Sequence, residues 1–246
     1  KNLSLSGMEY KYSRTKNLFS DSETVTTISN SFFPLGANGR DGLPFFNYSI
    51  NLSRLEQYWG LDKWFKSIVL SHSYTGQESK TYKEVDGVTL LQKVDFTKNF
   101  SPLVSVTGKL QKIPDLSMTV RYNDLLTIYN TGTQTERKSK NEITFSTTYK
   151  KRNGFKIKLP GIKNIELEND MTFKFDLSYS EDETLLSYVL TNDLDDFQRT
   201  SFSKNITIKP SMTYSFSKFV DGNVYISHII TETMSSGKKE DKISQK

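Results

Sequence analysis

The sequence predicts an all-β fold, either an antiparallel transmembrane β-barrel or a sector of a very large one. Long rows of alternating apolar and polar residues indicate strands, and the composition argues against helices. Ala37 is the only alanine among 246 residues, and alanine is the best helix former. Aromatic residues reach 13% although hydrophobic residues are only 35%, which suits strands with one wet face better than disorder. We expect residues 1–246 to form one β-barrel region.

The clearest row runs from Ile165 to Tyr179. Its apolar residues share one parity, its charged and hydroxylic residues share the other, and only Asn169 breaks the apolar set. Because successive side chains of a strand point to opposite faces, a strand here has one apolar face and one polar face. The row exceeds the ~5–6 residues typical of strands, and a tilted strand of ~9–11 residues already crosses a bilayer core.

The same alternation predicts strands on both sides of this row. Those before it lie near residues 3–12, 25–33, 46–53, 67–74, 100–110, 116–122, 143–149 and 155–159, and those after it near 185–190, 205–216 and 224–230. Between them, the polar stretches 75–87, 131–141 and 180–184 are interpreted as breaks. Asp221-Gly222 is a hairpin signal. Pro210 lies inside a row, where it cannot donate a ladder bond, and therefore indicates a bulge or a rim.

Two segments depart from the alternation. Residues 55–66 have near-helical spacing and contain Trp59 and Trp64, which predicts a short helix at a membrane interface, where amphipathic aromatic residues concentrate. A helical cap over an ordinary core fits the same spacing. Residues 34–44 are rich in glycine but lack the Lys-Ser/Thr ending and the following helix of a phosphate-binding loop, so they are interpreted as a plain loop.

Three features favour a membrane barrel over a soluble sandwich: the length of the rows, charges in the middle of their polar faces, and tyrosines near the row ends. The residues predicted to face lipid are Phe173, Phe175, Leu177, Ile206, Ile208, Met212, Tyr214, Phe216, Leu116, Met118 and Val120. The residues predicted to face the lumen are Lys174, Asp176, Arg121 and Lys209. Strands in hydrocarbon must close without free edges, because every backbone polar group needs a partner there.

Catalytic and metal chemistry has no candidate in the sequence. Cysteine is absent, and no HExxH or GxSxG motif is present. His72 and His228 are the only histidines, and each shares the parity of apolar neighbours, which favours a packed or rim position. The acidic segment 192–196 has oxygen ligands for calcium, but its spacing fits no EF-hand. We expect no enzyme activity, cofactor or metal. The mild net charge of +5 suits an anionic surface at least as well as nucleic acid, and a nucleic-acid binder is disfavoured because basic residues are not interleaved with aromatic residues on one face.

The sequence resembles the C-terminal part of the SprA (Sov) family, the outer-membrane translocons of the type IX secretion system. The resemblance rests on the order of FFNYSINLSRLEQYWGLDKWFKSIVLSHSYTGQ, NFSPLVSVTGKL, IPDLSMTVRYN, NGFKIKLPGIKNIELENDMTFKFDLSYSEDET and PSMTYSFSKFVDGNVYIS. It implies an outer-membrane location, a protein-conducting pore, gliding motility as a linked process, and accessory outer-membrane and periplasmic proteins that gate or plug the pore. The chain would then contribute part of the wall, in contact with lipid and lipopolysaccharide, secreted cargo and the rest of the same barrel.

The two ends of the sequence agree with a wall sector. The N-terminus begins like the middle of a strand, and the C-terminus is a charged tail, 238–246, without a terminal aromatic residue. We therefore expect an internal piece of a longer protein, with the final strand beyond this sequence. Two alternatives stay open at this point: a small, complete, porin-like barrel, and a soluble β-rich surface adhesin domain.

Overall fold

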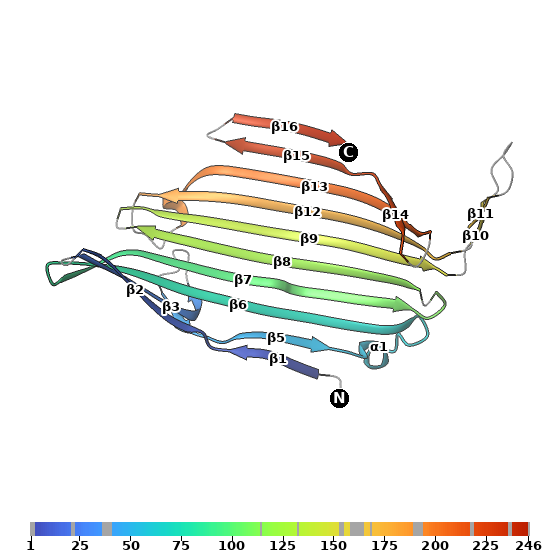
Figure 1. Cartoon of the computed structure of the whole chain (residues 1–246), viewed down its shortest axis with the longest axis horizontal. Helices are drawn as coiled ribbons and strands as arrows, with labels where there is room; N and C mark the ends of the chain where they lie inside the picture. The colour runs from blue at the N-terminus through green and yellow to red at the C-terminus, as the bar shows by residue number, and fades with distance from the viewer. Residues whose placement is uncertain are drawn as a thin grey trace.

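The protein is all-β, as the sequence predicts, and its sheet is open. The computed structural model describes residues 3–20, 23–35, 41–113, 115–131, 133–152, 155–157, 165–167, 169–188, 194–216, 219–235 and 238–245. Within these residues, fourteen strands form one antiparallel sheet and two more form a separate hairpin (Figure 1). The sheet does not close on itself.

The sheet follows the order β1-β5-β6-β7-β8-β9-β12-β13-β15-β16, with β2, β3, β4 and β14 attached beside this path. The strands of the path are β1 (Leu3–Glu9), β5 (Asn47–Leu52), β6 (Phe65–Val85), β7 (Val88–Leu110), β8 (Leu116–Thr131), β9 (Thr135–Lys151), β12 (Met171–Ser187), β13 (Gln198–Ser215), β15 (His228–Ser235) and β16 (Lys238–Gln245). The attached strands are β2 (Tyr12–Ser20), β3 (Glu23–Leu35), β4 (Asp41–Pro44) and β14 (Asp221–Tyr225). β10 (Phe155–Ile157) and β11 (Ile165–Leu167) make the separate hairpin.

In two places, two short strands pair one after the other along the same side of a longer strand. β3 pairs with β6 as far as Ser31, and β5 continues along the same side of β6 from Tyr48. The end of β3, together with β4 and the two residues after it, leaves the sheet as a hairpin that we call the insert hairpin (residues 32–35 and 41–46). β14 and β15 likewise follow one another along β13.

The row from Ile165 to Tyr179 is not one strand, and this part of the prediction is wrong. Ile165–Leu167 belongs to the β10–β11 hairpin, and the sheet strand begins at Met171 and runs on to Ser187. Asn169, which interrupts the apolar parity, bonds instead to the carbonyl of Phe216 at 3.0 Å. Of the predicted strand 155–159, residues 155–157 form β10, and residues 158 and 159 lie outside the described residues.

Most residues of the polar stretches interpreted as breaks are strand, and turns occupy only short parts of them, such as residues 86–87 and 133–134. Residues 75–85 continue β6, residues 135–141 begin β9, residues 180–184 continue β12, and most of the charged tail forms β16. Their partners explain this, because charged side chains meet across the strands: Lys140 lies 3.6 Å from Asp182, and Lys204 lies 3.5 Å from Glu181. The actual β6–β7 turn is Asp86-Gly87, with φ values of 50° and 80°, as a tight two-residue hairpin requires.

Pro210 lies in an unbroken β13, opposite Phe175. Its carbonyl accepts a bond from Ile226 N at 3.1 Å on the other side, and a residue of an antiparallel ladder directs its N–H and C=O toward the same neighbour. The missing N–H therefore faces the gap between β14 and β15, where no ladder bond is lost. The irregularity expected at Pro210 is therefore the interruption between β14 and β15, on the strand position that neighbours β13.

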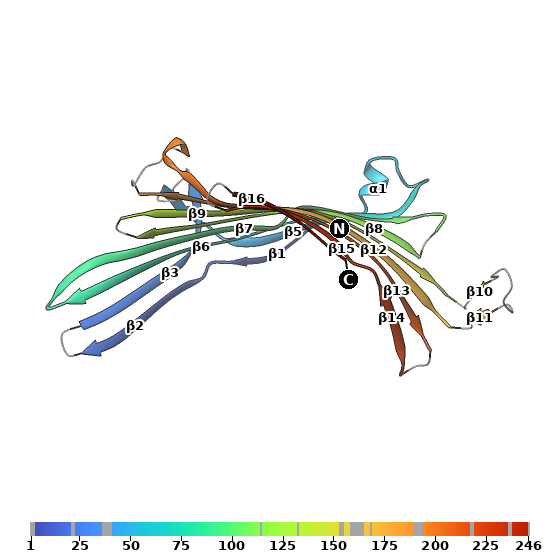
Figure 2. The same ribbon diagram turned by 90° about the horizontal axis from the view of Figure 1, so that it is seen from above.

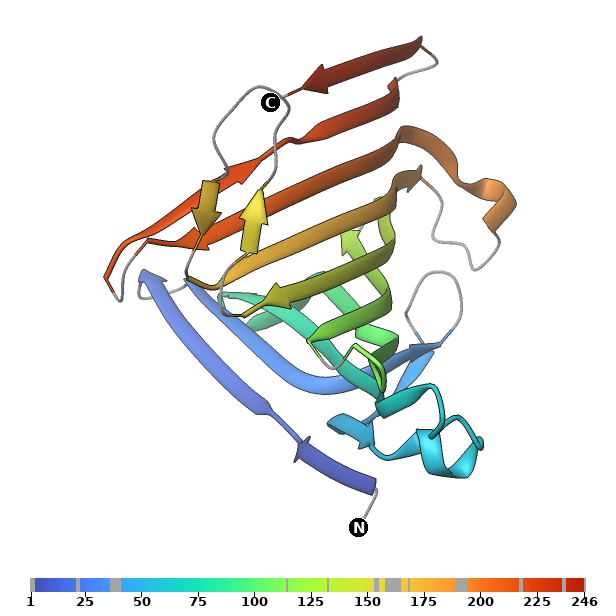
Figure 3. The ribbon, with the colours of Figure 1, turned by 90° about the vertical axis from the view of Figure 1, so that its right-hand side faces the viewer.

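The sheet is strongly curved, and the insert hairpin and the α1 segment project from its convex side (Figures 2 and 3). The insert hairpin covers the main buried cluster of the described residues, in which Phe32 packs with Phe96, Leu126 and Ile128. Phe96 and Ile128 pair directly across β7 and β8 and so share one face of the sheet, which is therefore the convex face. Apart from this cluster and the α1 segment, which covers Ile68, the described sheet is a single layer.

Candidate functional site

An apolar band crosses the convex face from strand to strand. Directly opposed residues of an antiparallel sheet lie on the same face, so the register decides which side chains are neighbours. Leu177 pairs with Phe145 and with Ile208, and Phe145 pairs in turn with Val120. Val120 pairs with Val106 across β7. The predicted rows of separate strands therefore merge into one continuous surface.

We call the end of the band at which β8 and β12 begin, near Leu116 and Met171, its lower end. All eleven residues predicted to face lipid belong to the band or to this lower end. Phe173, Phe175 and Leu177 oppose even-numbered residues of β13 and odd-numbered residues of β9, and those of β9 oppose Leu116, Met118 and Val120. Tyr214 pairs with Met171, and Phe216 follows the end of β13. The register thus shows that ten of these residues share one face, whereas Phe216 lies beyond the paired residues. Contact of this face with lipid stays a prediction.

The band is uncovered. Val120 is 49% exposed, Ile143 48% and Leu177 37%, although each lies in mid-strand beside other apolar residues. From Met171 to Tyr179 the row measures roughly 26 Å at ~3.3 Å per residue, close to the ~25 Å apolar band of outer-membrane barrels. An apolar surface that spans several strands exceeds what a monomer normally exposes to water.

Aromatic residues lie at both ends of the band. At the opposite end, which we call the upper end, Tyr122 and Tyr179 each pair with Ile143. At the lower end Tyr149 stacks on Phe173, with 6.4 Å between ring centroids, and Tyr214 meets Phe216 edge to face at 4.9 Å. Two aromatic girdles around an apolar band are typical of a membrane barrel.

The concave face is lined mainly by hydroxyl and amide groups that bond across the strands. Ser29 donates to Ser79 at 3.0 Å, and Ser71 donates to Asn51 at 2.6 Å. Farther along the sheet, Thr107 and Thr119 lie 3.0 Å apart. These groups satisfy one another in pairs, and with charged pairs such as Lys140 and Asp182 on the same face they make the concave wall wettable.

The four residues predicted to face the lumen lie on this concave face. Asp176 is held by Lys174 at 2.9 Å and by the Ser146 hydroxyl at 2.6 Å. Lys209, which pairs with Asp176 across the strands, places its ammonium 4.7 Å from the ring centre of Tyr225. Arg121 is exposed and opposes Thr144.

The predicted helix near residues 55–66 is shorter than expected, because only α1 (Leu55–Tyr58) is helical. The rest of the segment is held by Glu56, which is 5% exposed and accepts a bond from Ile68 N at 2.7 Å. Trp59 and Trp64 remain 54% and 68% exposed. The sequence suggested no role for Glu56, because an acid in a short polar turn gives no sign that it will be buried.

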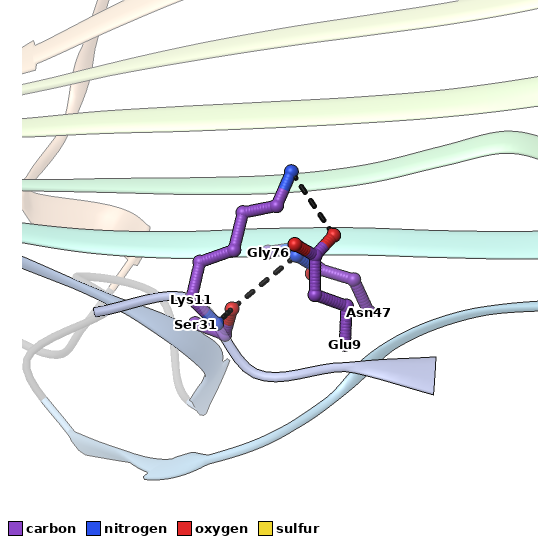
Figure 4. Close-up of polar contacts among 5 residues, drawn as sticks. All are labelled: Glu9, Lys11, Ser31, Asn47 and Gly76. Carbon is purple, nitrogen blue, oxygen red and sulfur yellow. Dashed lines mark hydrogen bonds and ion pairs between the residues drawn. The ribbon is translucent and has the colours of Figure 1, made fainter. Parts of the chain in front are cut away.

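No pattern in the sequence indicated the junction of β3, β5 and β6. Ser31 accepts bonds from Lys11 N at 2.8 Å and from Asn47 Nδ2 at 3.3 Å, and Asn47 Oδ1 accepts from Gly76 N at 2.8 Å (Figure 4). Lys11 also pairs with Glu9 at 3.2 Å. Together these residues line a polar hollow of about 670 Å³ beside the β1–β2 edge. Only the tertiary pairing brings them together.

His72 is packed, as interpreted from the sequence. Its Nδ1 lies 2.6 Å from the carbonyl of Leu103, which can only accept, so Nδ1 carries the proton. Its Nε2 lies 3.0 Å from the Tyr48 hydroxyl. Among the described residues no group of three or more acidic or histidine side chains is arranged to hold a metal. Asn192 and Asp193 of the acidic segment lie outside the described residues.

Neither a protein-family model nor a curated protein matches this chain. The resemblance to the SprA (Sov) family therefore stays a prediction from the sequence. In the described part of the chain, no helix has the length and hydrophobicity needed to cross a membrane.

Proposed function

We propose that this chain is a wall sector of a large outer-membrane β-barrel that conducts proteins in a type IX-like secretion system. The observation that carries the membrane part is the exposed apolar band on the convex face, backed by a hydroxyl-rich concave face. A barrel in lipid presents its convex side to hydrocarbon and its concave side to a wet lumen. The band also argues against a soluble adhesin, which would bury such a surface.

The open sheet favours a sector over a small, complete barrel. β1 and β2 pair on one side only within the described residues, and so does β16. Free edges are incompatible with hydrocarbon, so further strands are needed to complete the wall. Conduction of protein is supported by the sequence resemblance and by the polar concave face, whose hydroxyl, amide and charged groups bond to one another across the strands.

A matched pair of substitutions tests the orientation of the wall. Leu177→Arg places a charge in the band, whereas Ser178→Arg places the same charge one residue later on the concave face, opposite Thr144 and Thr207. Arginine on the lipid face near the midplane costs about 2–4 kcal/mol. In the full-length protein we expect Leu177→Arg to reduce the assembled, heat-modifiable form in outer-membrane fractions, and Ser178→Arg to assemble normally. Equal assembly of both variants would refute the orientation.

Site-specific photo-crosslinking tests the conduction of protein. A photoreactive phenylalanine at Arg121 points into the proposed lumen, and the same residue at Val120 points outward. During active secretion we expect adducts with secreted proteins from position 121 only. Adducts at neither position, in a correctly assembled barrel, would leave the wall assignment intact and contradict protein conduction.

A further inference from the structure

The lower end of the convex face carries a compact platform of aromatic and basic residues. We call it the rim platform, and it comprises residues 54–66 with the adjoining β7–β8 turn, residues 111–113. Tyr58 is 70% exposed, Trp59 54% and Trp64 68%. The basic side chains of the platform are also exposed: Arg54, Lys63, Lys66 and Lys112.

The platform is held rigidly against the sheet. Leu61 N bonds to the carbonyl of Glu56 at 2.7 Å, and Trp64 N bonds to the carbonyl of Leu61 at 2.9 Å. Gln111 N bonds to the carbonyl of Trp64 at 2.8 Å and ties the segment to the β7–β8 turn. The Glu56 carboxylate points inward to Ile68 N, so Asp62 is the one exposed acid of residues 54–66.

We infer that the rim platform binds the headgroups of anionic phospholipids, with its aromatic rings at the depth of the interface. This inference rests on the proposed function. Tryptophan and tyrosine concentrate at membrane interfaces, and basic residues beside an inserted surface attract anionic headgroups. The platform is attached at the end of the apolar band on β6, because Glu56 of α1 accepts a bond from Ile68 N and Ile68 pairs with Gly108 of β7, so platform and band meet the same leaflet.

The strands identify which leaflet this is. β8 begins at Leu116 and β12 at Met171, directly at the lower end of the band, whereas both run on well past its upper end. Beyond Tyr179, β12 continues for about eight residues, roughly 26 Å at ~3.3 Å per residue. Outer-membrane barrels carry their longer projections on the extracellular side. The rim platform therefore faces the periplasmic leaflet, which consists of phospholipid.

Fluorescence quenching by brominated lipids tests this directly. The full-length barrel protein is reconstituted into vesicles containing brominated phosphatidylglycerol or brominated phosphatidylcholine at the same mole fraction. The difference between the wild type and a Trp59→Phe/Trp64→Phe variant isolates the signal of these two residues. We expect stronger quenching by the phosphatidylglycerol.

Lys63→Gln/Lys66→Gln should reduce this preference about fivefold for each cation removed at low salt, because a cation near an anionic surface contributes about 1 kcal/mol. Arg14→Gln/Lys16→Gln, on β2 and away from the platform, is the matched control and should keep the preference. Equal quenching by the two lipids in the wild type overturns the inference.

Val120→Trp in the Trp59→Phe/Trp64→Phe background separates this inference from the proposed function. Quenching at position 120, without quenching at Trp59 and Trp64 in the wild type, places the wall in lipid and overturns the platform assignment alone. Absence of quenching at all three positions overturns both.

Discussion

Replacement of Gly76 by alanine should release the insert hairpin from the sheet. Gly76 lies on β6 at the point where β3 leaves the sheet and β5 takes its place. A Cβ atom there would lie 2.0 Å from the Tyr74 hydroxyl and 2.1 Å from the carbonyl oxygen of Phe32. The Phe32 oxygen is backbone and cannot rotate away, so the hairpin itself must move.

The cost follows from the contacts that this movement breaks. Tyr74 is fully buried and donates to the Phe32 carbonyl at 2.6 Å, and loss of a buried partner costs about 1–3 kcal/mol. Overpacking adds about 1–3 kcal/mol. We take about 3 kcal/mol as the change in the free energy of hairpin docking, which corresponds to roughly a hundredfold increase in opening at ~1.4 kcal/mol per tenfold.

Hydrogen exchange followed by mass spectrometry on the assembled protein measures this opening. Peptides covering residues 32–35 and 41–46 should exchange roughly a hundredfold faster in Gly76→Ala, while β8 and β9 keep their protection. Thr75→Ala, at an exposed position on the opposite face, is the control and should exchange like the wild type. Tyr74→Phe/Gly76→Ala should recover only part of the protection, because the Phe32 oxygen still blocks the Cβ. Wild-type exchange in Gly76→Ala would refute the close approach.

Two further predictions concern local turns. Glu56→Ala leaves Ile68 N–H without its acceptor and should destabilise the rim platform by about 1–3 kcal/mol, seen as faster exchange of residues 54–66, whereas Glu56→Gln keeps an acceptor oxygen and should stay close to the wild type. Gly87→Val places a β-branched residue at φ 80° and should destabilise the β6–β7 hairpin by about 1–3 kcal/mol. In gel electrophoresis after heating, the folded protein should therefore be lost at a lower temperature than in the wild type. Asp86→Asn should be tolerated there, because asparagine accepts a left-handed conformation. Unchanged thermal behaviour of Gly87→Val would contradict this turn geometry.

The sequence determined the fold class and the membership of the two faces. Strand parity depends only on local geometry, so the apolar set at Phe173, Phe175 and Leu177 and the polar set at Lys174 and Asp176 could be separated without knowing any partner strand. The scarcity of alanine and the exceptional spacing of residues 55–66 likewise indicated one short helix within an otherwise β protein.

The ends of the strands depend on pairing between distant segments. Residues 180–184 contain no apolar alternation, yet β12 continues through them because β9 and β13 supply hydrogen bonds and opposite charges on both sides. Ile165–Leu167 has the right parity but pairs with β10 instead. Ser31, Asn47 and Gly76 meet only because β3 and β5 share one side of β6. Pairing between distant segments is a property of the whole sheet, so no local pattern encodes it.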